Sequence, residues 1–160
     1  MTHSPNHPLT SVLDLADPAL RPLDGPRDLR SAYPLMHELR PHLASEAEFV
    51  ARVERMGAQG YRLVGAFDGS MLVALAGYRL QENLVYGTFL YVDDLVTSEA
   101  SRGGQWGARL LRALDRVGRA EGCARLVLDT GLANSRAQRF YFREGLYSGA
   151  LRFQKLLDTH

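Results

Sequence analysis

The sequence has 160 residues but only one cysteine, Cys123, and no apolar run near the roughly 20 residues that a membrane span requires. A single cysteine excludes an intramolecular disulfide, so the cytoplasm is the simplest location. The formal net charge is only +1, and basic residues are dispersed among acidic ones. This balance argues against a nucleic-acid binder and against attachment to an anionic membrane.

Two further signals are missing. The stretch MTHSPNHPLT has neither the charged nor the apolar region of a secretory signal, so we expect none. The histidines and the cysteine show no metal-ligand spacing, so we expect no metal site.

The length fits one domain with one core. Residues 1–18 are rich in Pro, Ser, Thr and Asp, and we predict a loose tail or a short extra strand there. Residues 19–160 are predicted to form the domain.

Hydrophobic periodicity predicts the order β, α, α, β, β, β, α, β, α, β. A short strand near Leu20 precedes a helix that Pro34 kinks and that stops before Pro41. Ser45 and Glu48 predict a capping box for the second helix. The expected strands then cover residues 61–67, 71–80, 84–97, 123–130 and 146–157, with hairpin turns at 68–70 and 81–83. The fold class is therefore α/β, with a mixed, mostly antiparallel sheet of six to seven strands and about four helices on both faces.

The stretch SEASRGGQWGARLLRAL (residues 98–114) joins a strand to a helix. Glycines let backbone N–H groups approach an anion closely, and the helix start adds unpaired donors. Arg102 adds a guanidinium suited to phosphate oxygens. The pattern lacks the Lys-Ser or Lys-Thr of a P-loop, and it follows antiparallel strands rather than the parallel strands of a Rossmann turn. A phosphate-binding turn and a simple loop-to-helix turn both remain open.

Two segments resemble the GNAT superfamily, the Gcn5-related N-acetyltransferases. VDDLVTSEASRGGQWGARLL resembles the family's cofactor-binding segment, and NSRAQRFYFREGL resembles its pattern N-x-x-A-x-x-F-Y-x-x-x-G-F, with Leu146 in place of the final Phe. The resemblance extends from about residue 19 to the end of the sequence. It implies an acetyl-CoA-dependent N-acetyltransferase that acetylates a primary amine by direct attack in a ternary complex.

The resemblance also implies a binding site for acetyl-CoA. Strand residues would run along the pantetheine arm, a glycine-rich turn would hold the pyrophosphate, and a later helix would contact the arm again. The residues concerned are Leu95, Val96, Thr97, Arg102, Gly103, Gly104, Gln105, Trp106, Gly107, Ala108, Asn134, Ala137 and Phe140. Asn134 also suits a plain helix cap, and Trp106 also suits packing of the helix onto the sheet.

Acetyl transfer requires the ammonium to lose a proton and the leaving thiolate to gain one. The resemblance implies Tyr141 as the general acid, although a core aromatic is the competing interpretation. Asp93 is implied as the base, acting through water. Asp94 is the second candidate base, with a structural ion pair as its alternative role. Adjacent strand residues point to opposite faces unless a bulge intervenes, so one carboxylate is expected to face the acceptor.

The sequence departs from the family pattern at two places. Gln105 stands where the family has glycine, which adds a Cβ near the phosphates. The sequence after Gly145 has room for one long strand rather than a pair, so a partner subunit in a homodimer is a candidate for completing the acceptor site.

The acceptor itself is expected to be a small-molecule or peptide amine, not nucleic acid or a membrane. The resemblance places its wall near His37, Arg40 and His42 and around Tyr78 and Tyr91. An inactive acyl-CoA-binding sensor on the same fold is the alternative function. Cys123 is expected to be a small buried hydrophobe rather than a nucleophile, because no His or Asn accompanies it.

Overall fold

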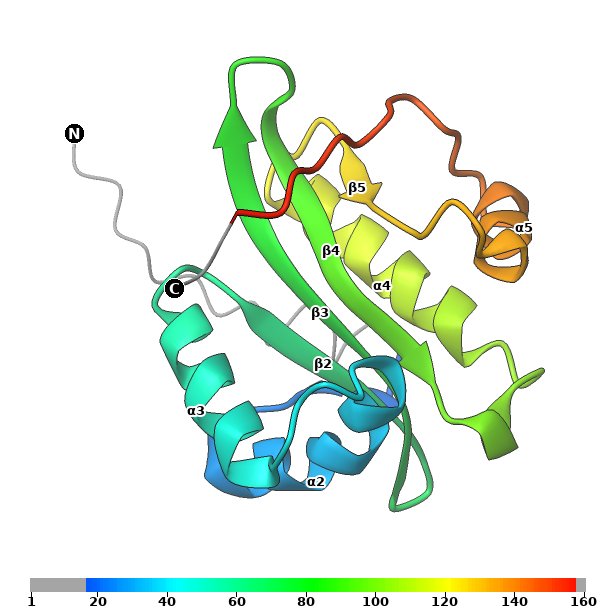
Figure 1. The fold of residues 1–160 in the computed structure, drawn as a ribbon. Coiled ribbons are helices and arrows are strands. Elements are labelled where there is room, and N and C mark those ends of the chain that lie inside the picture. The colour runs from blue at the N-terminus through cyan, green and yellow to red at the C-terminus, as the bar shows by residue number, and fades with distance from the viewer. Residues whose placement is uncertain (1–16, 158–160) are drawn as a thin grey trace. The chain divides into compact units, whose positions relative to one another are not determined.

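A computed structural model describes residues 17–157, which form two compact units, one ending at Leu128 and one beginning at Asp129 (Figure 1). The expected tail therefore lies almost wholly outside the described residues. None of the helices within 17–157 is long and apolar enough to cross a membrane.

The first unit contains a five-stranded sheet in the order β1-β2-β3-β4-β5. Its strands are β1 (Leu20–Pro22), β2 (Arg62–Asp68), β3 (Met71–Asn83), β4 (Gly87–Thr97) and β5 (Leu126–Leu128). All neighbours are antiparallel except β4 and β5, which run parallel. The mixed, mostly antiparallel sheet is confirmed.

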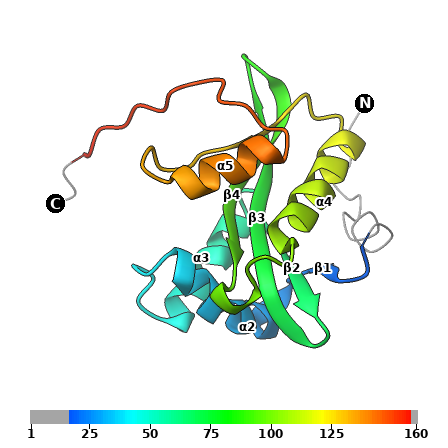
Figure 2. The ribbon, with the colours of Figure 1, turned by 90° about the vertical axis from the view of Figure 1, so that its right-hand side faces the viewer.

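Helices cover both faces of this sheet (Figure 2). Helices α2 (Gly25–Leu39) and α3 (Glu46–Gly57) pack on one face, and α4 (Trp106–Ala120) packs on the other. Alternate strand residues divide between two buried clusters. Leu63 and Leu75 join the α2 and α3 side, whereas Val64 and Ala76 join the α4 side. We refer to these as the α2/α3 face and the α4 face.

Local signals set the helix boundaries largely as expected. The Ser45 side chain accepts from the Glu48 N–H at 3.1 Å, and the Glu48 carboxylate accepts from the Ala44 N–H at 2.9 Å. The capping box thus closes one residue earlier than its standard form. Helix α2 continues through Pro34 to Leu39, so the predicted stop before Pro41 is confirmed.

The turn between β3 and β4 lies at Leu84–Tyr86, not at the predicted 81–83. Asn83 is the cause, because its side-chain oxygen accepts from the N–H groups of Val85 (3.0 Å) and Tyr86 (2.7 Å). An Asx turn of this kind places the reversal after the asparagine. Strand β3 is correspondingly longer than predicted.

The second unit contains α5 (Ser135–Arg143). The predicted strand over 146–157 is wrong for the described residues, which form no strand after α5. Ser148 and Gly149 interrupt its apolar alternation, and glycine weakens a strand interior. The described residues therefore hold five strands, fewer than the six to seven predicted, and the four α-helices expected.

Candidate active site

The glycine-rich turn leads from the short 3₁₀ helix η1 (Glu99–Ser101) into α4. Gly103 has a φ of +92° and Gln105 a φ of +60°, so the chain is twice in the left-handed region. A Cβ on Gly104 would lie 2.7 Å from Nε1 of Trp106, so any other residue there would require the Trp106 ring to move. The first N–H groups of α4 have no intrahelical acceptors, and together with Arg102 they suit an anion.

Trp106 packs against the buried cluster of the α4 face, as the sequence predicts for one of its two roles. The Arg109 guanidinium lies 4.5 Å from its ring centroid and forms a two-point ion pair with Asp17, with one N–O distance of 2.7 Å. The bonds from Arg109 hold the pKa of the Asp17 carboxyl below its usual value. The contacts of Trp106 and Arg109 hold the first turn of α4 in place next to the glycine-rich turn.

A β-bulge lies at the two adjacent aspartates of β4. Gly77 of β3 pairs with Asp94, but the next residue, Tyr78, pairs with Val92. Asp93 is therefore the extra residue, and a bulge of this kind changes the facing of side chains after it. The bulge is the stated exception to strand alternation, and the partners of both carboxylates lie together on the α2/α3 face.

Asp94 is held on both oxygens. The Tyr61 hydroxyl, just before β2, donates to Oδ2 at 2.6 Å, and the Arg40 Nε, at the end of α2, donates to Oδ1 at 2.9 Å. Tyr61 is only 3% exposed, and a Cβ on Gly77 would lie 2.0 Å from its hydroxyl oxygen. Burial, then the Asp94 charge, raises the pKa of Tyr61 well above its ordinary value. Tyr61 therefore remains a proton donor to Asp94.

Asp93 forms a two-point pair with Arg79, with distances of 3.0 and 3.1 Å from Nη2 and Nε. The Arg79 guanidinium also lies 5.6 Å from the Tyr61 ring centroid. The Arg79–Asp93 pair and the Tyr61–Asp94 pair are therefore neighbours. Burial raises the pKa of Asp93, and the Arg79 bonds partly oppose this effect. A raised pKa makes Asp93 a stronger base than an exposed aspartate.

The backbone of β4 offers a free edge after the bulge. On one side, Leu95, Val96 and Thr97 pair with β3. On the other side, β5 pairs with β4 only from Leu90 to Val92. The amides of Leu95–Thr97 therefore have no β5 partner, which is the arrangement that an extended amide-bearing arm needs to pair like a strand.

In the second unit, Asn134 is the N-cap of α5, with its side-chain oxygen accepting from the Ala137 N–H at 3.1 Å. The capping role is therefore real, and it engages only the oxygen of the amide. The rings of Phe140 and Tyr141 lie 5.4 Å apart between centroids. Burial raises the pKa of Tyr141, which keeps its phenol protonated through neutral pH.

The residues expected around the acceptor divide between the two faces. Arg40 contacts both aspartates, since its Nη2 also donates to the Asp93 carbonyl at 2.9 Å. The His37 ring lies 3.1 Å from the Leu43 carbonyl, and His42 is exposed. Tyr78 is wrong as a wall residue, because it is buried in the α4-face cluster, where burial raises its pKa to about 12. Tyr91 lies between Leu90 and Val92, two members of that cluster, so strand alternation places it on the α2/α3 face.

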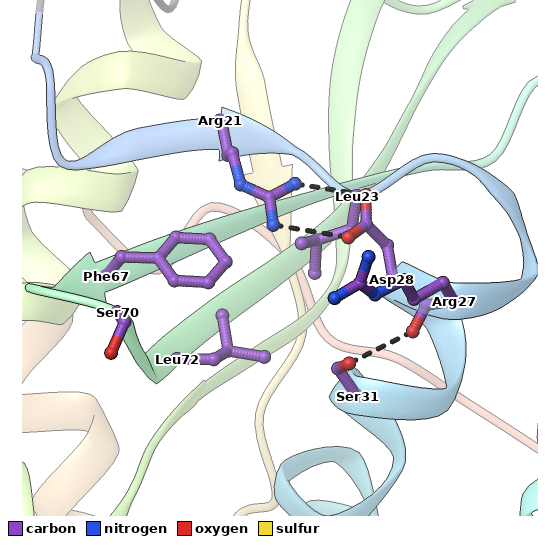
Figure 3. Close-up of a pocket in the computed structure, with 8 residues that line it drawn as sticks. All are labelled: Arg21, Leu23, Arg27, Asp28, Ser31, Phe67, Ser70 and Leu72. Atoms are coloured by element: carbon purple, nitrogen blue, oxygen red, sulfur yellow. Dashed lines mark hydrogen bonds and ion pairs between the residues drawn. The ribbon is translucent and has the colours of Figure 1, made fainter.

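A cavity of about 590 Å³ lies elsewhere in the first unit, beside β1 and the β2–β3 hairpin (Figure 3). Arg21 spans it, chelating Asp28 and lying 4.4 Å from the Phe67 ring centroid. Its other lining residues are Leu23, Arg27, Ser31, Ser70 and Leu72. None of the eight is a predicted site residue.

Cys123 is partly buried against the α4-face cluster, and burial raises the pKa of its thiol. An activated nucleophile needs the opposite shift. No three His, Cys, Asp or Glu residues within 17–157 are grouped so that they could hold a metal ion.

Three residues of the site were not predicted as site residues from the sequence: Tyr61, Gly77 and Arg79. Two acidic residues in an apolar strand require partners, and a glycine inside a neighbouring strand marks a close approach. Together these two signals are typical of a packed polar cluster, but they do not identify the residues that supply it.

Comparison with known proteins agrees with this geometry. Residues 26–145 match the model of the Acetyltransferase (GNAT) family. An uncharacterized N-acetyltransferase, YhdJ, of Bacillus subtilis is 28% identical over 123 residues, which cover 76% of this chain and 86% of the relative. An aminoglycoside N(6')-acetyltransferase type 1 of Serratia marcescens is 31% identical over 104 residues, covering 62% of this chain and 68% of the relative.

Among solved structures, AAC(6')-Iy in complex with the bisubstrate analog CoA-S-monomethyl-acetylneamine superposes with a TM-score of 0.73. It is 17% identical, and the match covers 86% of this chain and 97% of that one. Such a likeness shows the fold. The family match covers most of the chain, and the protein belongs to the GNAT family of acetyltransferases.

Proposed function

We propose that the protein transfers the acetyl group of acetyl-CoA to a primary amine by direct attack in a ternary complex. The observation that carries this proposal is the course of β4. A bulge bearing two carboxylates, a strand edge without a β5 partner and a helix start shaped for an anion follow one another within residues 93–108. These are the three features needed for proton transfer, for holding pantetheine and for holding pyrophosphate.

The residues present fit the cofactor. Gly103 leaves open space where a Cβ would stand, Gly104 gives room to the Trp106 ring, and Arg102 supplies a charge for the phosphates. We propose that Arg102, Gly103, Gly104, Gln105, Trp106, Gly107 and Ala108 form the pyrophosphate site, with Leu95, Val96 and Thr97 along the pantetheine arm. Capping engages only the oxygen of Asn134, so its amide nitrogen is a suitable donor to the arm. Ala137 and Phe140 are proposed to line the same arm.

Bound acetyl-CoA supplies an activated thioester, and the side chains manage the protons. Asp93 is proposed to accept the proton of the ammonium through a water molecule, because the neutral amine is the attacking form. Tyr141 is proposed to donate its phenol proton to the departing thiolate. Its raised pKa supports this role, because the phenol is protonated at the pH of the reaction.

The acceptor is proposed to be a small-molecule amine. A relative 31% identical is named an aminoglycoside N(6')-acetyltransferase, and a solved structure with the same fold holds an acetylneamine analog. The near-neutral chain also supports a small molecule over nucleic acid or a membrane surface. A peptide amine is the second candidate acceptor. The single cysteine supports a cytoplasmic location.

Incubation with acetyl-CoA, a thiol-reactive dye and a panel of amines tests the proposal. The panel contains aminoglycosides, polyamines, amino acids and a lysine peptide. We expect thiol release that depends on one amine class. An inactive sensor would bind acetyl-CoA in calorimetry but release no thiol above the amine-free control with any member of the panel.

A homodimer is proposed from the residues after α5. Leu151, Phe153, Leu156 and Leu157 are each more than 70% exposed, and exposed apolar groups of this size mark interaction surfaces. Light scattering on the full chain should give the mass of two copies, and Phe153→Ser with Leu156→Ser should give the mass of one. A monomeric parent contradicts the proposal.

A further inference from the structure

Four charged side chains meet at the β4 bulge, two of each sign. Arg79 of β3 chelates Asp93, and Arg40 at the end of α2 binds Asp94. Tyr61 lies between the two pairs, donating to Asp94 and packing beneath Arg79. The two ion pairs cancel, so the four side chains do not attract an ammonium by excess negative charge. The way in which the four side chains are paired therefore needs another explanation.

We propose that Arg79 is a positioning residue, which holds Asp93 in place to accept the amine proton, while Tyr61 and Arg40 reserve Asp94 as a fixed anchor. This inference rests on the proposed acetyl transfer and names the residues that prepare its base.

The two carboxylates differ in how many partners they have. Asp94 accepts hydrogen bonds from the Tyr61 hydroxyl on one oxygen and from Nε of Arg40 on the other, and Nη2 of Arg40 lies within ion-pair distance of that second oxygen, at 2.8 Å. Its side chain is 11% exposed, so little of it is left for a substrate or water. Within residues 17–157, the Asp93 carboxylate is hydrogen-bonded to the side chain of Arg79 alone, and the Asp93 side chain is 19% exposed. An ionised carboxylate has about four acceptor sites, and the Arg79 chelate uses two of them.

The charges around Asp93 determine the direction of the expected pH effect. Arg79 faces it from β3, Arg40 from the end of α2, Asp94 from its own strand and Tyr61 from the start of β2. Burial raises the pKa of Asp93, whereas Arg79 lowers it by hydrogen bonding and by charge. Without Arg79 the pKa of Asp93 should rise further, and the carboxylate should lose its fixed orientation.

The test is Arg79→Gln, with Arg79→Lys as the conservative variant. Arg21→Gln is the matched control, because Arg21 also chelates one aspartate, Asp28, and also packs over one aromatic ring, Phe67. The kcat of Arg79→Gln should fall about ten- to a hundredfold, less than the 10²–10⁴-fold contribution of a general base itself. The acid limb of its pH–rate profile should move to higher pH, with an unchanged KM for acetyl-CoA. Arg79→Lys should be intermediate, and Arg21→Gln should keep the parent profile.

A second measurement separates this inference from the proposed function. Carbon NMR of the carboxyl groups follows the titration of Asp93 without any reaction, and in Arg79→Gln that titration should move to higher pH. If the parent protein transfers no acetyl group to any amine, the proposed function is overturned, and the positioning role of Arg79 is overturned with it. An active parent whose Arg79→Gln variant keeps its kcat, pH profile and Asp93 titration overturns the positioning role alone.

Discussion

The hydroxyl of Tyr61 reaches Asp94 directly across Gly77, with a distance of 2.6 Å between the phenol and carboxylate oxygens. Gly77 is also the β3 residue that pairs with Asp94, immediately beside the bulge. A residue without a side chain thus lets a buried tyrosine cross the sheet surface and bind the opposite strand. This contact links the packing of the α2/α3 face to the position of both aspartates.

Gly77→Ala should therefore disturb the site as well as the fold. The new Cβ would lie 2.0 Å from the Tyr61 hydroxyl oxygen and 2.5 Å from Cζ, so the ring must move. Overpacking of this kind costs about 1–3 kcal/mol in the free energy of unfolding, measurable by urea denaturation. Gly57→Ala is the control, because a Cβ there meets nothing within 4 Å. Equal stability of both variants would show that Tyr61 does not need the space over Gly77.

Replacing the two aspartates should separate their roles. Asp94→Asn leaves Arg40 and Tyr61 without their charged acceptor, so it should cost about 1–3 kcal/mol of stability. Asp93→Asn should instead remove the acid limb of the pH–rate profile. In the parent that limb should lie above the ordinary aspartate pKa of about 3.9, because burial raises the pKa of Asp93 and the base must be ionised to act. If the Asp93→Asn variant keeps the acid limb of the parent pH–rate profile, Asp93 is excluded as the base.

Arg102→Ala should weaken coenzyme A binding. Loss of a hydrogen bond to a charged group costs about 1.5–3 kcal/mol, which calorimetry resolves as a decrease in affinity of about ten- to a hundredfold. Arg112→Ala removes the same charge from the exposed side of α4 and should bind coenzyme A like the parent. Unchanged affinity in Arg102→Ala would argue against this turn as the phosphate site.

Gln105→Gly should stabilise the protein and leave coenzyme A affinity equal or higher. Gln105 precedes α4 with a φ of +60° and a ψ of +19°, so it is the N-cap and not a helical residue. A left-handed conformation costs an L-residue roughly 1–2 kcal/mol, and glycine avoids this cost. Thermal unfolding and calorimetry measure the two effects. A large drop in affinity would indicate that the Gln105 side chain itself contacts the cofactor.

Tyr141→Phe should slow turnover about 10²–10⁴-fold while acetyl-CoA binding is largely retained, because only the phenol oxygen is lost. The general acid must be protonated, so the parent rate should fall as pH rises through the pKa of Tyr141. Burial raises that pKa, so the fall should begin above the ordinary value near 10, and it should be absent in the variant. Full turnover with an unchanged profile would make Tyr141 a packing residue.

Local signals in the sequence predict most of the first unit. The capping box at Ser45, the hairpin at Asp68 and Gly69 and the glycine-rich turn before α4 each depend on residues close together in sequence. The turn between β3 and β4 was misplaced by three residues, because the Asn83 side-chain oxygen accepts two backbone hydrogen bonds that place the reversal after the asparagine. The strand predicted over 146–157 failed because apolar content alone does not supply a pairing partner.

The site was harder to predict than the fold. Two adjacent acidic residues in β4 indicated a site. The face of the sheet on which each side chain lies depends on a β-bulge, and no local sequence pattern marks that bulge. Their partners Arg40, Tyr61 and Arg79 come from three other parts of the chain, so only the folded sheet brings them together. The left-handed backbone of Gln105 was likewise not evident, because glutamine rarely adopts it.

The most direct test of acetyl transfer is mass spectrometry of the protein and of the amine after incubation with acetyl-CoA. With its amine present, the protein should produce that amine carrying one acetyl group together with an equal amount of free coenzyme A. Without the amine, the mass of the protein should stay unchanged, as direct attack requires. Binding of acetyl-CoA with no acetylated amine from the whole panel, or an acetyl group on Cys123 before the amine is added, would contradict it.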